Sequence, residues 1–411
     1  MRKFAVIGGG VAGLTVARAL KDTADVVVFE KENSPGGLIR CKRVNGSLFH
    51  LCGGHVFNSK DKDVLNWFWS IFDREKDFIN ARRRSAVCLE DGSFVDYPIE
   101  NHVYQLPRSV QESFYRDCDE MIKNPKTKYE NFEDFLLCRF GRTLFDLYFK
   151  HYNDKVWRSD LKKIPLTWLE GKLPMPTPQE MIAANMNHIE EREFVHSSFY
   201  YEKNNGSQFL ADTLARGLNV RYNANVFEIS IDSGRPVVNG EAFDAAVFCG
   251  NVKHLPALFA GLPGDMVSEI EKLEYHGTTA VFCETDPVPY SWFYQPSRKH
   301  QSHRFICTGN FASSNNAAGK MTCTVEFTDY ISRDEIVRQL KYMPFHPKYI
   351  DHHYSEFSYP IQHVSTRRTI SALKEFLAKR SIYLSGRFAE WEYFNMDAAM
   401  GSALRLCAGL T

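Results

Sequence analysis

Residues 1–14, MRKFAVIGGGVAGL, contain an apolar run that ends in three consecutive glycines. The run KFAVI is typical of a buried parallel strand, and the following VAGLTVARALKDT has the apolar spacing of a helix. Gly8, Gly10 and Gly13 fit Gly-x-Gly-x-x-Gly, which allows a tight turn, the approach of a pyrophosphate and close packing of helix on strand. A second strand, DVVVFE, ends at Glu30, where a carboxylate can bind ribose hydroxyls. The sequence therefore predicts a Rossmann-like unit that binds a dinucleotide.

The composition is that of a folded protein with a large core. The chain has 411 residues, of which 44% are hydrophobic, enough for two or three domains. Its 50 basic and 50 acidic residues cancel, which argues against a nucleic-acid partner. The ten cysteines are scattered without any Cys-x-x-Cys, so we expect thiols of a reducing cytosol and no metal site. Because the first apolar run is shorter than the ~20 residues of a membrane span, we expect a cytoplasmic protein that does not cross a membrane.

Two further segments resemble the FAD-binding motifs of amine-oxidase-like and glutathione-reductase-like flavoproteins. One is EKENSPGGLIR, with a glycine pair shortly after the ribose carboxylate, and the other is KRSIYLSGRFAE with the helix NMDAAMGSALRL that follows it. Two central segments, VRYNANVFEISI and FDAAVFCGN, look like strands that would complete such a domain. The resemblance implies FAD as the cofactor. Beyond the first glycines, it assigns to the cofactor Gly36, Gly37, Val226, Gly386, Arg387, Asn395 and Met396.

The first and last segments of the chain would thus build one doubly wound α/β domain around FAD. We assign to this domain residues 1–60, 205–255 and 375–411. Helical periodicity, as in SVQESFYRDCDEMIK, predicts a mostly helical insertion, a bundle, within 61–200. Alternating β-branched and aromatic residues predict an antiparallel sheet domain for the substrate, built from 80–105 and 256–374.

A closer resemblance extends over nearly the whole chain. Seven segments, in order, are similar to motifs of the UDP-galactopyranose mutase family, and more to its eukaryotic-type members than to the common bacterial ones. They are HLCGGHVFNS, VDYPIENH, YNDKVW, WLEGKLPMP, SWFYQPSRKHQSHRF, SYPI and GRFAEWEYFNMD. The 28 residues from Tyr359 to Arg387 and the six from Arg387 to Tyr393 also fit the family spacing.

This resemblance implies an isomerase that interconverts the pyranose and furanose forms of a UDP-hexose such as UDP-galactose, with no net oxidation. In the family, N5 of the reduced flavin is the nucleophile, and the nucleotide diphosphate leaves and returns. Cations must hold the diphosphate while charge develops on it. An external reductant such as NAD(P)H is compatible with this scheme. The sequence does not specify the sugar, the base or the oligomeric state. A homo-oligomer is compatible with it.

The resemblance assigns the diphosphate to two cations and three tyrosines. Arg304 lies ten residues after Tyr294, as in the family. Lys172 stands where the family has an arginine on a mobile loop, and a lysine cannot fork two phosphate oxygens. The hydroxyls of Tyr294, Tyr359 and Tyr393 would reach the same diphosphate.

Further assignments concern the flavin and the sugar. Gly54 and His55 belong to the Gly-Gly-His loop, which in the family lies beside the flavin ring. Asn153 and Trp157 match the active-site pair of the family, although core packing would also explain a tryptophan in YNDKVW. We expect His55, Arg304 and Lys172 to act in catalysis and the others to bind substrate or cofactor.

The base segment departs from the family. Tyr97 would stack on uracil, and Glu100 stands where the family commonly has glutamine. A glutamate can accept the uracil N3–H but cannot donate to a carbonyl. The nearby basic run 82–84 is short and has acidic neighbours, so we expect a solvated charge run there.

Two other functions share the FAD motifs. One is an FAD-dependent oxidoreductase of the amine oxidase or protoporphyrinogen oxidase type, which would not need paired cations facing the flavin. The other is a non-catalytic flavin-binding relative, suggested by the departures at Lys172 and Glu100. Such a relative would not need His55 or the three tyrosines. The sequence favours the mutase.

Overall fold

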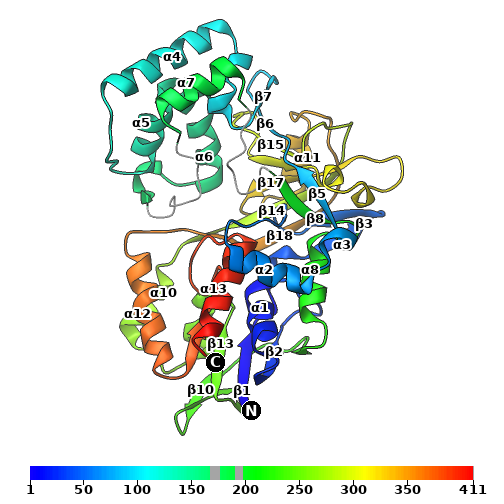
Figure 1. Cartoon of the computed structure of the whole chain (residues 1–411), viewed down its shortest axis with the longest axis vertical. Coiled ribbons are helices and arrows are strands. Elements are labelled where there is room, and N and C mark those ends of the chain that lie inside the picture. Colours follow the sequence, from blue (N-terminus) through cyan, green and yellow to red (C-terminus); the bar gives the residue numbers. More distant parts are fainter. Residues whose placement is uncertain (167–175, 190–197, 411) are drawn as a thin grey trace.

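A computed structural model gives the structure of the protein and describes residues 1–166, 176–189 and 198–410. A parallel sheet with its helices lies at one end of the molecule, a larger sheet in the middle and a group of helices at the other end (Figure 1). Both termini lie at the end with the parallel sheet. Among the residues that the structure describes, no helix is long and apolar enough to cross a membrane.

The first sheet has five strands, all of them parallel. Their order is β19 (Ile382–Leu384), β13 (Ala245–Phe248), β1 (Arg2–Ile7), β2 (Ala24–Phe29) and β9 (Asn219–Arg221). Alternate residues of a strand point to opposite faces. Phe4 and Val6 therefore pack with α1 (Val11–Leu20) and α13 (Met396–Ala408), whereas Ile7 packs with α12 (Thr366–Ala378) on the other face. Helices on both faces confirm the predicted doubly wound α/β unit.

The second sheet has seven strands. Their order is β18 (Lys348–Pro360), β14 (Tyr275–Glu284), β17 (Thr322–Thr328), β16 (Arg304–Ile306), β15 (Trp292–Tyr294), β6 (Ser85–Cys88) and β7 (Phe94–Asp96). Every pair is antiparallel, as predicted, except that β6 joins β15 in parallel. Phe305 and Val325 pack on one face against α11 (Arg333–Leu340). The neighbouring Arg304 and Glu326 are cross-strand partners, and strand alternation turns them to the opposite face.

The helical group contains α4 (Arg108–Lys123), α5 (Phe132–Leu144), α6 (Lys150–Trp157) and α7 (Pro178–Asn187), with a five-residue π-helix (Phe145–Phe149) between α5 and α6. The first two helices of the predicted helical segment lie apart from this group (Figure 1). The side chains of α2 (Lys62–Ile71) share a core with α1 and α13. The segment 61–200 therefore also contributes a helix to the parallel-sheet unit.

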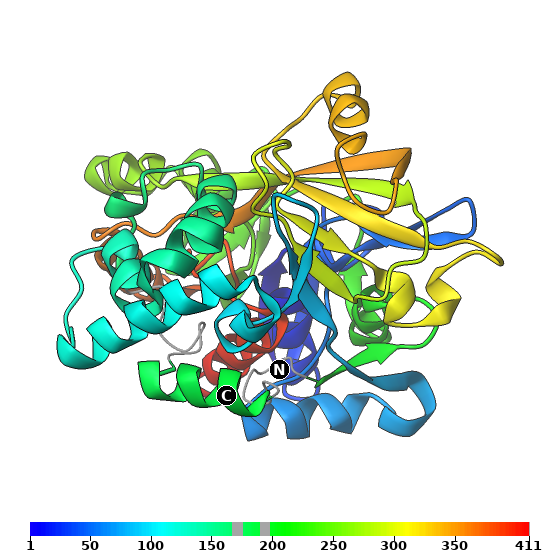
Figure 2. The ribbon, with the colours of Figure 1, turned by 90° about the horizontal axis from the view of Figure 1, so that it is seen from above.

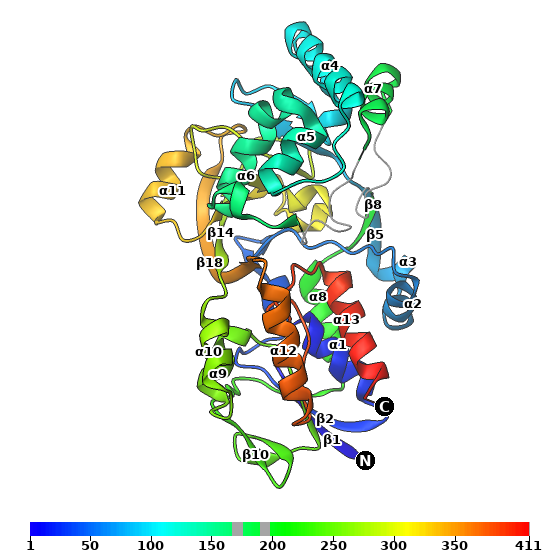
Figure 3. The same cartoon turned by 90° about the vertical axis from the view of Figure 1, so that its left-hand side faces the viewer.

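Three small sheets and four further helices complete the α-helices and strands of the described residues. The sheets pair β3 (Cys41–Val44) with β4 (Ser47–His50), β5 (Phe78–Arg82) with β8 (Ser198–Glu202), and β10 (Ile229–Asp232) with β11 (Arg235–Val238) and β12 (Glu241–Ala242). The helices are α3 (Arg74–Asp77), α8 (Ser207–Ala215), α9 (Leu255–Leu258) and α10 (Gly264–Glu271). Seen from above, the helical group and the seven-stranded sheet lie side by side (Figure 2). In the side view, both lie beyond the same end of the parallel-sheet unit (Figure 3).

Candidate active site

The glycine turn between β1 and α1 has the geometry that its motif predicts. Gly8 has a φ of +110°, which side chains rarely adopt. A Cβ on Gly13 would lie 2.0 Å from the carbonyl oxygen of Gly8, so only glycine fits where α1 packs on the turn. Glu30, buried just after β2, accepts a hydrogen bond of 2.7 Å from the backbone N–H of Gly9. Its other oxygen accepts from the backbone N–H of Glu32 at 2.9 Å.

The same turn has room for the pyrophosphate of a dinucleotide. A Cβ added to Gly10 would meet only the Cα of Gly37, at 3.9 Å. The Gly36 N–H donates to the Gly9 carbonyl at 2.8 Å, which holds the second glycine pair against the first. Within the described residues, α1 has no side-chain cap and no acid in its first turn, so its N–H groups are available to an anion. These residues fit the pyrophosphate of FAD.

The closing motif approaches the turn from the other end of the chain. Gly386 has a φ of +109°, and a Cβ there would lie 2.8 Å from the Cβ of Ala12 in α1. Arg387 Nε donates to the Phe394 carbonyl at 2.8 Å, which fixes the segment that leads into α13. Asn395, the N-cap of α13, makes no side-chain capping bond. The predicted residues of both termini therefore meet at α1.

Two of the predicted cofactor residues are buried in cores. Val226 packs with Ile7 and Phe248 under the parallel sheet. Met396 packs in the core shared by α1, α2 and α13. The structure gives both side chains a packing role, and their contact with a cofactor stays a prediction.

The loop after β4 connects the parallel-sheet unit with the seven-stranded sheet. The Gly53 N–H donates to the buried Glu326 carboxylate at 2.9 Å. Gly54 lies so close to β16 that a Cβ would be 2.7 Å from Ile306 Cγ2. His55 Nε2 bonds the carbonyl of Leu38 at 3.0 Å. The loop therefore sets His55 at the boundary between the two sheets.

His55 is neutral in this environment. Burial, followed by the charges of Arg387 and Arg304, lowers the pKa of His55 from 6.5 to about 4. Because the Leu38 carbonyl can only accept, Nε2 carries the proton and Nδ1 is an acceptor. A histidine in this state offers a hydrogen-bond acceptor and adds no positive charge.

Arg304 is held by a buried carboxylate. Glu326 accepts from Arg304 Nε at 2.7 Å and pairs with Nη2 at 2.6 Å. Nη2 also donates to the Tyr359 hydroxyl at 3.3 Å, and the Tyr359 ring stacks on Tyr393 with centroids 5.4 Å apart. Nη1 has no hydrogen bond to any residue in the part of the chain that the structure describes. Arg304 is thus fixed on one side and can bind an anion on the other.

Tyr294 lies at the centre of an aromatic cluster. Its hydroxyl accepts from Nη2 of Arg83 at 2.6 Å, and the Arg83 guanidinium lies 4.6 Å from the ring centroid of Trp292. The Tyr97 ring is 4.7 Å from that of Tyr294, and Tyr152 of α6 contacts Tyr294 at 5.3 Å, close to edge-on. The structure therefore brings a predicted base residue and a predicted diphosphate residue together.

The sequence motifs did not reveal Arg83, Tyr152 and Glu326. Arg83 corrects the expectation of a solvated run at 82–84, because its guanidinium is part-buried against two aromatic rings while its two neighbours are exposed. A signal for Glu326 was present, since a lone carboxylate in the apolar strand TCTVEFT needs a cationic partner. Tyr152 directly precedes the predicted Asn153, but nothing in the sequence distinguishes it from a packing tyrosine.

Asn153 and Trp157 bond to each other within α6. Trp157 Nε1 donates to Asn153 Oδ1 at 3.1 Å, and Asn153 Nδ2 donates to the Phe149 carbonyl at 2.7 Å. Both side chains are buried, and Trp157 belongs to the core of the helical group. A contact of this pair with a sugar stays a prediction.

Two predicted residues remain. Glu100 is buried in a short 3₁₀ turn (Ile99–Asn101), three residues after Tyr97. Lys172 lies outside the described residues. Within the residues that the structure describes, no group of three or more metal-ligating side chains is found.

Comparisons with known proteins agree with this geometry. Residues 6–74 match the family described as an NAD(P)-binding Rossmann-like domain. The chain is 22% identical over 307 residues to dTDP-fucopyranose mutase of Escherichia coli. This match covers 71% of this chain and 75% of that protein. It is also 22% identical over 190 residues to a Klebsiella pneumoniae protein named probable UDP-galactopyranose mutase. This match covers 42% of this chain and 45% of that protein. A crystal structure of reduced UDP-galactopyranose mutase matches with a TM-score of 0.87 and 20% identity, over 100% of this chain and 96% of that one.

These matches confirm the predicted resemblance and the predicted fold class. The sequence matches carry the relationship, while the structural match shows the fold. The chain is a distant homologue of the mutases named for dTDP-fucopyranose and UDP-galactopyranose, and it has the fold of UDP-galactopyranose mutase.

Proposed function

We propose that this chain is an FAD-dependent mutase that interconverts the pyranose and furanose forms of a nucleotide-diphosphate hexose, with a UDP-galactose-like sugar as the first candidate. The cluster around Arg304 carries the proposal. Glu326 fixes one side of the arginine, Tyr359 adds a hydroxyl, and the same carboxylate holds the loop of His55. A diphosphate bound there would leave and return at the border of the predicted flavin site.

The parallel-sheet unit would hold FAD. Gly8, Gly10 and the first turn of α1 would bind the pyrophosphate through backbone N–H groups, and Glu30 would accept from the ribose. In the reduced state FAD supplies the nucleophile, so the chain needs no nucleophilic side chain of its own. His55 would present its acceptor nitrogen at the border of this site without adding positive charge.

Arg304 and the tyrosines would hold the diphosphate. Glu326 accepts from Nε and pairs with Nη2 of Arg304, so Nη1 is the nitrogen that can donate to a phosphate oxygen. Burial raises the pKa of Tyr359 well above its ordinary value, so its hydroxyl stays protonated and can donate. A cation and donors placed before the reaction stabilise the charge that develops on a leaving diphosphate. Lys172 is our proposed second cation.

The base would lie near Tyr97 and Glu100. Uracil and thymine both present an N3–H, which a carboxylate accepts. The names of the two sequence relatives include a UDP sugar and a dTDP sugar. Both nucleotides therefore belong in the test.

The experiment is to incubate the dithionite-reduced protein with UDP-galactopyranose and dTDP-fucopyranose and to measure the furanose forms by chromatography. Exchange should require reduced flavin and consume no stoichiometric reductant, and the oxidised protein is the matched control. Oxygen uptake with an amine or a porphyrinogen would establish the oxidoreductase alternative instead. Binding of the nucleotide sugars without exchange would indicate a non-catalytic relative.

A further inference from the structure

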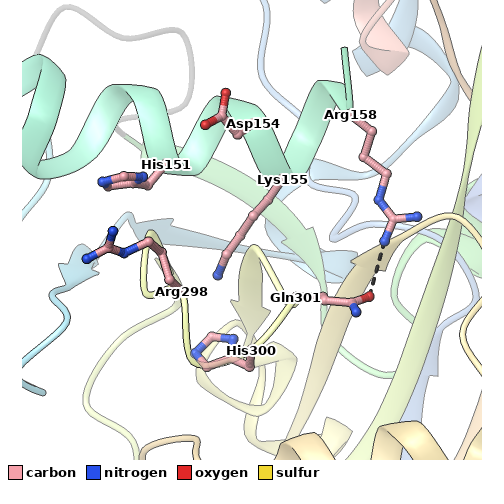
Figure 4. Close-up of a pocket in the computed structure, with 7 residues that line it drawn as sticks. All are labelled: His151, Asp154, Lys155, Arg158, Arg298, His300 and Gln301. Carbon is pink, nitrogen blue, oxygen red and sulfur yellow. Dashed lines mark hydrogen bonds between the residues drawn. The ribbon is translucent and has the colours of Figure 1, made fainter. Parts of the chain in front are cut away.

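A basic pocket lies on the side of α6 that faces away from Asn153 and Trp157. Its volume is about 350 Å³, and it is lined by one acid, Asp154, and by six other residues (Figure 4). These six are His151, Lys155, Arg158, Arg298, His300 and Gln301. They come from α6 and its C-cap and from the loop between β15 and β16.

Helix geometry separates this pocket from the proposed sugar site. His151 and Lys155 are four residues apart in α6, so they share one face of the helix, and Arg158 follows as its C-cap. Asn153 and Trp157 lie two residues before and after Lys155, which places them on the opposite face. A ligand in the pocket would therefore contact none of the residues assigned to FAD or to the nucleotide sugar.

The charges in the pocket are unbalanced. Three of the seven lining side chains are Lys or Arg, against one carboxylate. His300 adds no charge, because burial lowers its pKa from 6.5 to about 3. Asp154 is engaged by Lys150 at 2.8 Å, and Arg158 pairs with Asp329 at 3.5 Å while donating to Gln301 at 3.2 Å.

The other two cations of the pocket lack such partners. Among the described residues, neither Lys155 nor the guanidinium of Arg298 has a carboxylate at ion-pair distance. Glu90, whose charge acts on Lys155, accepts from the backbone N–H of Arg298 at 2.7 Å.

Lys155 extends from α6 toward the loop (Figure 4). Its Nζ donates to the carbonyls of Gln295 at 2.8 Å and Ser302 at 2.7 Å, which leaves one of its three N–H donors for a ligand. Burial lowers the pKa of Lys155 from 10.5 to about 7, against the opposing effect of Glu90. A bound anion would favour the protonated form.

His300 supplies an unsatisfied polar atom. Its side chain lines the pocket below Lys155 (Figure 4). The residue is only 5% exposed, and Nδ1 has no hydrogen-bond partner within the described part of the chain. A buried polar atom without a partner costs folding free energy, and in native structures it often marks the place of a ligand or an ordered water.

We propose that this pocket binds a phosphate-type oxyanion between Lys155, Arg298 and the amide of Gln301. The unpaired cations select a small, highly charged acceptor, and the Arg298 guanidinium can form two parallel bonds to it. The pocket volume is within the range of small-molecule sites, so a phosphate ester fits as well as free phosphate. The site is independent of the proposed mutase reaction.

The test is calorimetric titration of the flavin-containing protein with inorganic phosphate and with adenosine monophosphate at constant ionic strength, with chloride as the control anion. Tighter binding of adenosine monophosphate would show that the pocket takes a phosphate ester. Tighter binding of inorganic phosphate would show that it takes the free ion. Arg298→Ala should weaken binding about tenfold or more, as expected for loss of a charge-assisted bond. Lys299→Ala is the matched control, because Lys299 is the next residue, is exposed and does not line the pocket.

A second measurement uses sulfate, which does not titrate near neutrality. At pH 7.5, binding in buffers of different ionisation enthalpy should show proton uptake, because the anion raises the pKa of Lys155. Lys155→Met should abolish this uptake, whereas Arg304→Ala should leave the phosphate affinity unchanged. Absence of saturable binding, an equal loss in Lys299→Ala, or a loss in Arg304→Ala alone would overturn the proposal.

Discussion

Glu326 determines which part of Arg304 can meet a ligand. The carboxylate is fully buried, and a buried charge is stable only beside a partner that also forms hydrogen bonds. Arg304 and the Gly53 N–H provide these bonds at 2.7 and 2.9 Å. One side chain therefore couples the guanidinium to the loop of His55. A substitution at Arg304 should therefore alter the position of the His55 loop, and a change in the loop should alter the position of Arg304.

The hydroxyl of Tyr359 gives a test of the diphosphate site that changes little else. Tyr359→Phe should weaken the binding of UDP about tenfold, because one donor to a charged acceptor is lost. The FAD content should stay the same. Calorimetric titration with UDP measures the first quantity and flavin absorbance the second. Tyr354→Phe is the control, since Tyr354 is on the same strand but contacts Tyr330; equal affinities in both variants would contradict the assignment.

The spatial grouping of single residues was predictable where the resemblance supplies their spacing. Arg304, Tyr359 and Tyr393 were assigned from spacings within the resemblance, and the structure brings them together. Arg83 was not, because its partner Tyr294 is 211 residues away and is reached only through the parallel pairing of β6 with β15. A pairing of this kind is decided by the whole sheet and leaves no local pattern in the sequence.

At the scale of elements, Gly141 interrupts α5 in the helical group. Its φ of +80° and ψ of 164° are nearly exclusive to glycine, and a Cβ would lie 2.6 Å from the Cβ of Asp117. Gly141→Ala should therefore lower the free energy of unfolding by about 2–4 kcal/mol, combining strain and overlap. Gly217→Ala, at a positive φ of 75° with open space around it, should show only the strain. Urea unfolding compares the two, and equal losses would mean that the contact with Asp117 contributes nothing.

Elements were predictable when one period described them. The patterns for α1, α4 and α13 correspond to helices in the structure. The break at Gly141 depends on Asp117 of another helix, and the packing of α2 on α13 depends on how the chain returns to the first sheet. Both are tertiary effects that override the local pattern.

At the scale of the molecule, buried histidines at the end of β4 and in the loop after it make stability depend on pH. Burial lowers the pKa of His50 from 6.5 to about 3 and that of His55 to about 4. As the pH falls below 6.5, these histidines bind protons in the unfolded chain but stay neutral in the folded chain. Their contribution to the free energy of unfolding is therefore complete above pH 6.5 and is lost as the pH falls toward 4. Together, His50 and His55 should lower the free energy of unfolding by about 2 kcal/mol as the pH falls from 6.5 to 5.5. Urea unfolding across this range measures the loss.

Two variants separate this effect from the general acid sensitivity of the protein. His55→Gln should reduce the loss between pH 6.5 and 5.5 by about 1 kcal/mol, because one proton equilibrium disappears. The buried His300 and His303, whose pKa values burial also lowers, keep their share of the dependence. His346→Gln should leave it unchanged, since the His346 side chain is 85% exposed. A free energy that stays constant from pH 6.5 to 5.5 would show that the loop does not hold its histidines in the neutral form.

Gly10→Ala separates cofactor binding from folding of the whole molecule. In the structure a Cβ on Gly10 would meet only Gly37 Cα at 3.9 Å, so the variant without FAD should unfold with nearly the free energy of the parent. With FAD, the methyl group would occupy the space where the pyrophosphate approaches the backbone. We expect one FAD per chain in the parent and a much lower ratio of flavin to protein absorbance in Gly10→Ala.

Two further glycine variants complete this experiment. Gly13→Ala should lose stability as well as flavin, because its Cβ would lie 2.0 Å from the Gly8 oxygen. Gly264→Ala, at the start of α10 with nothing within 4 Å, should keep both. A full complement of FAD in Gly10→Ala would show that the turn does not hold the cofactor, and the mutase proposal would then lose its nucleophile.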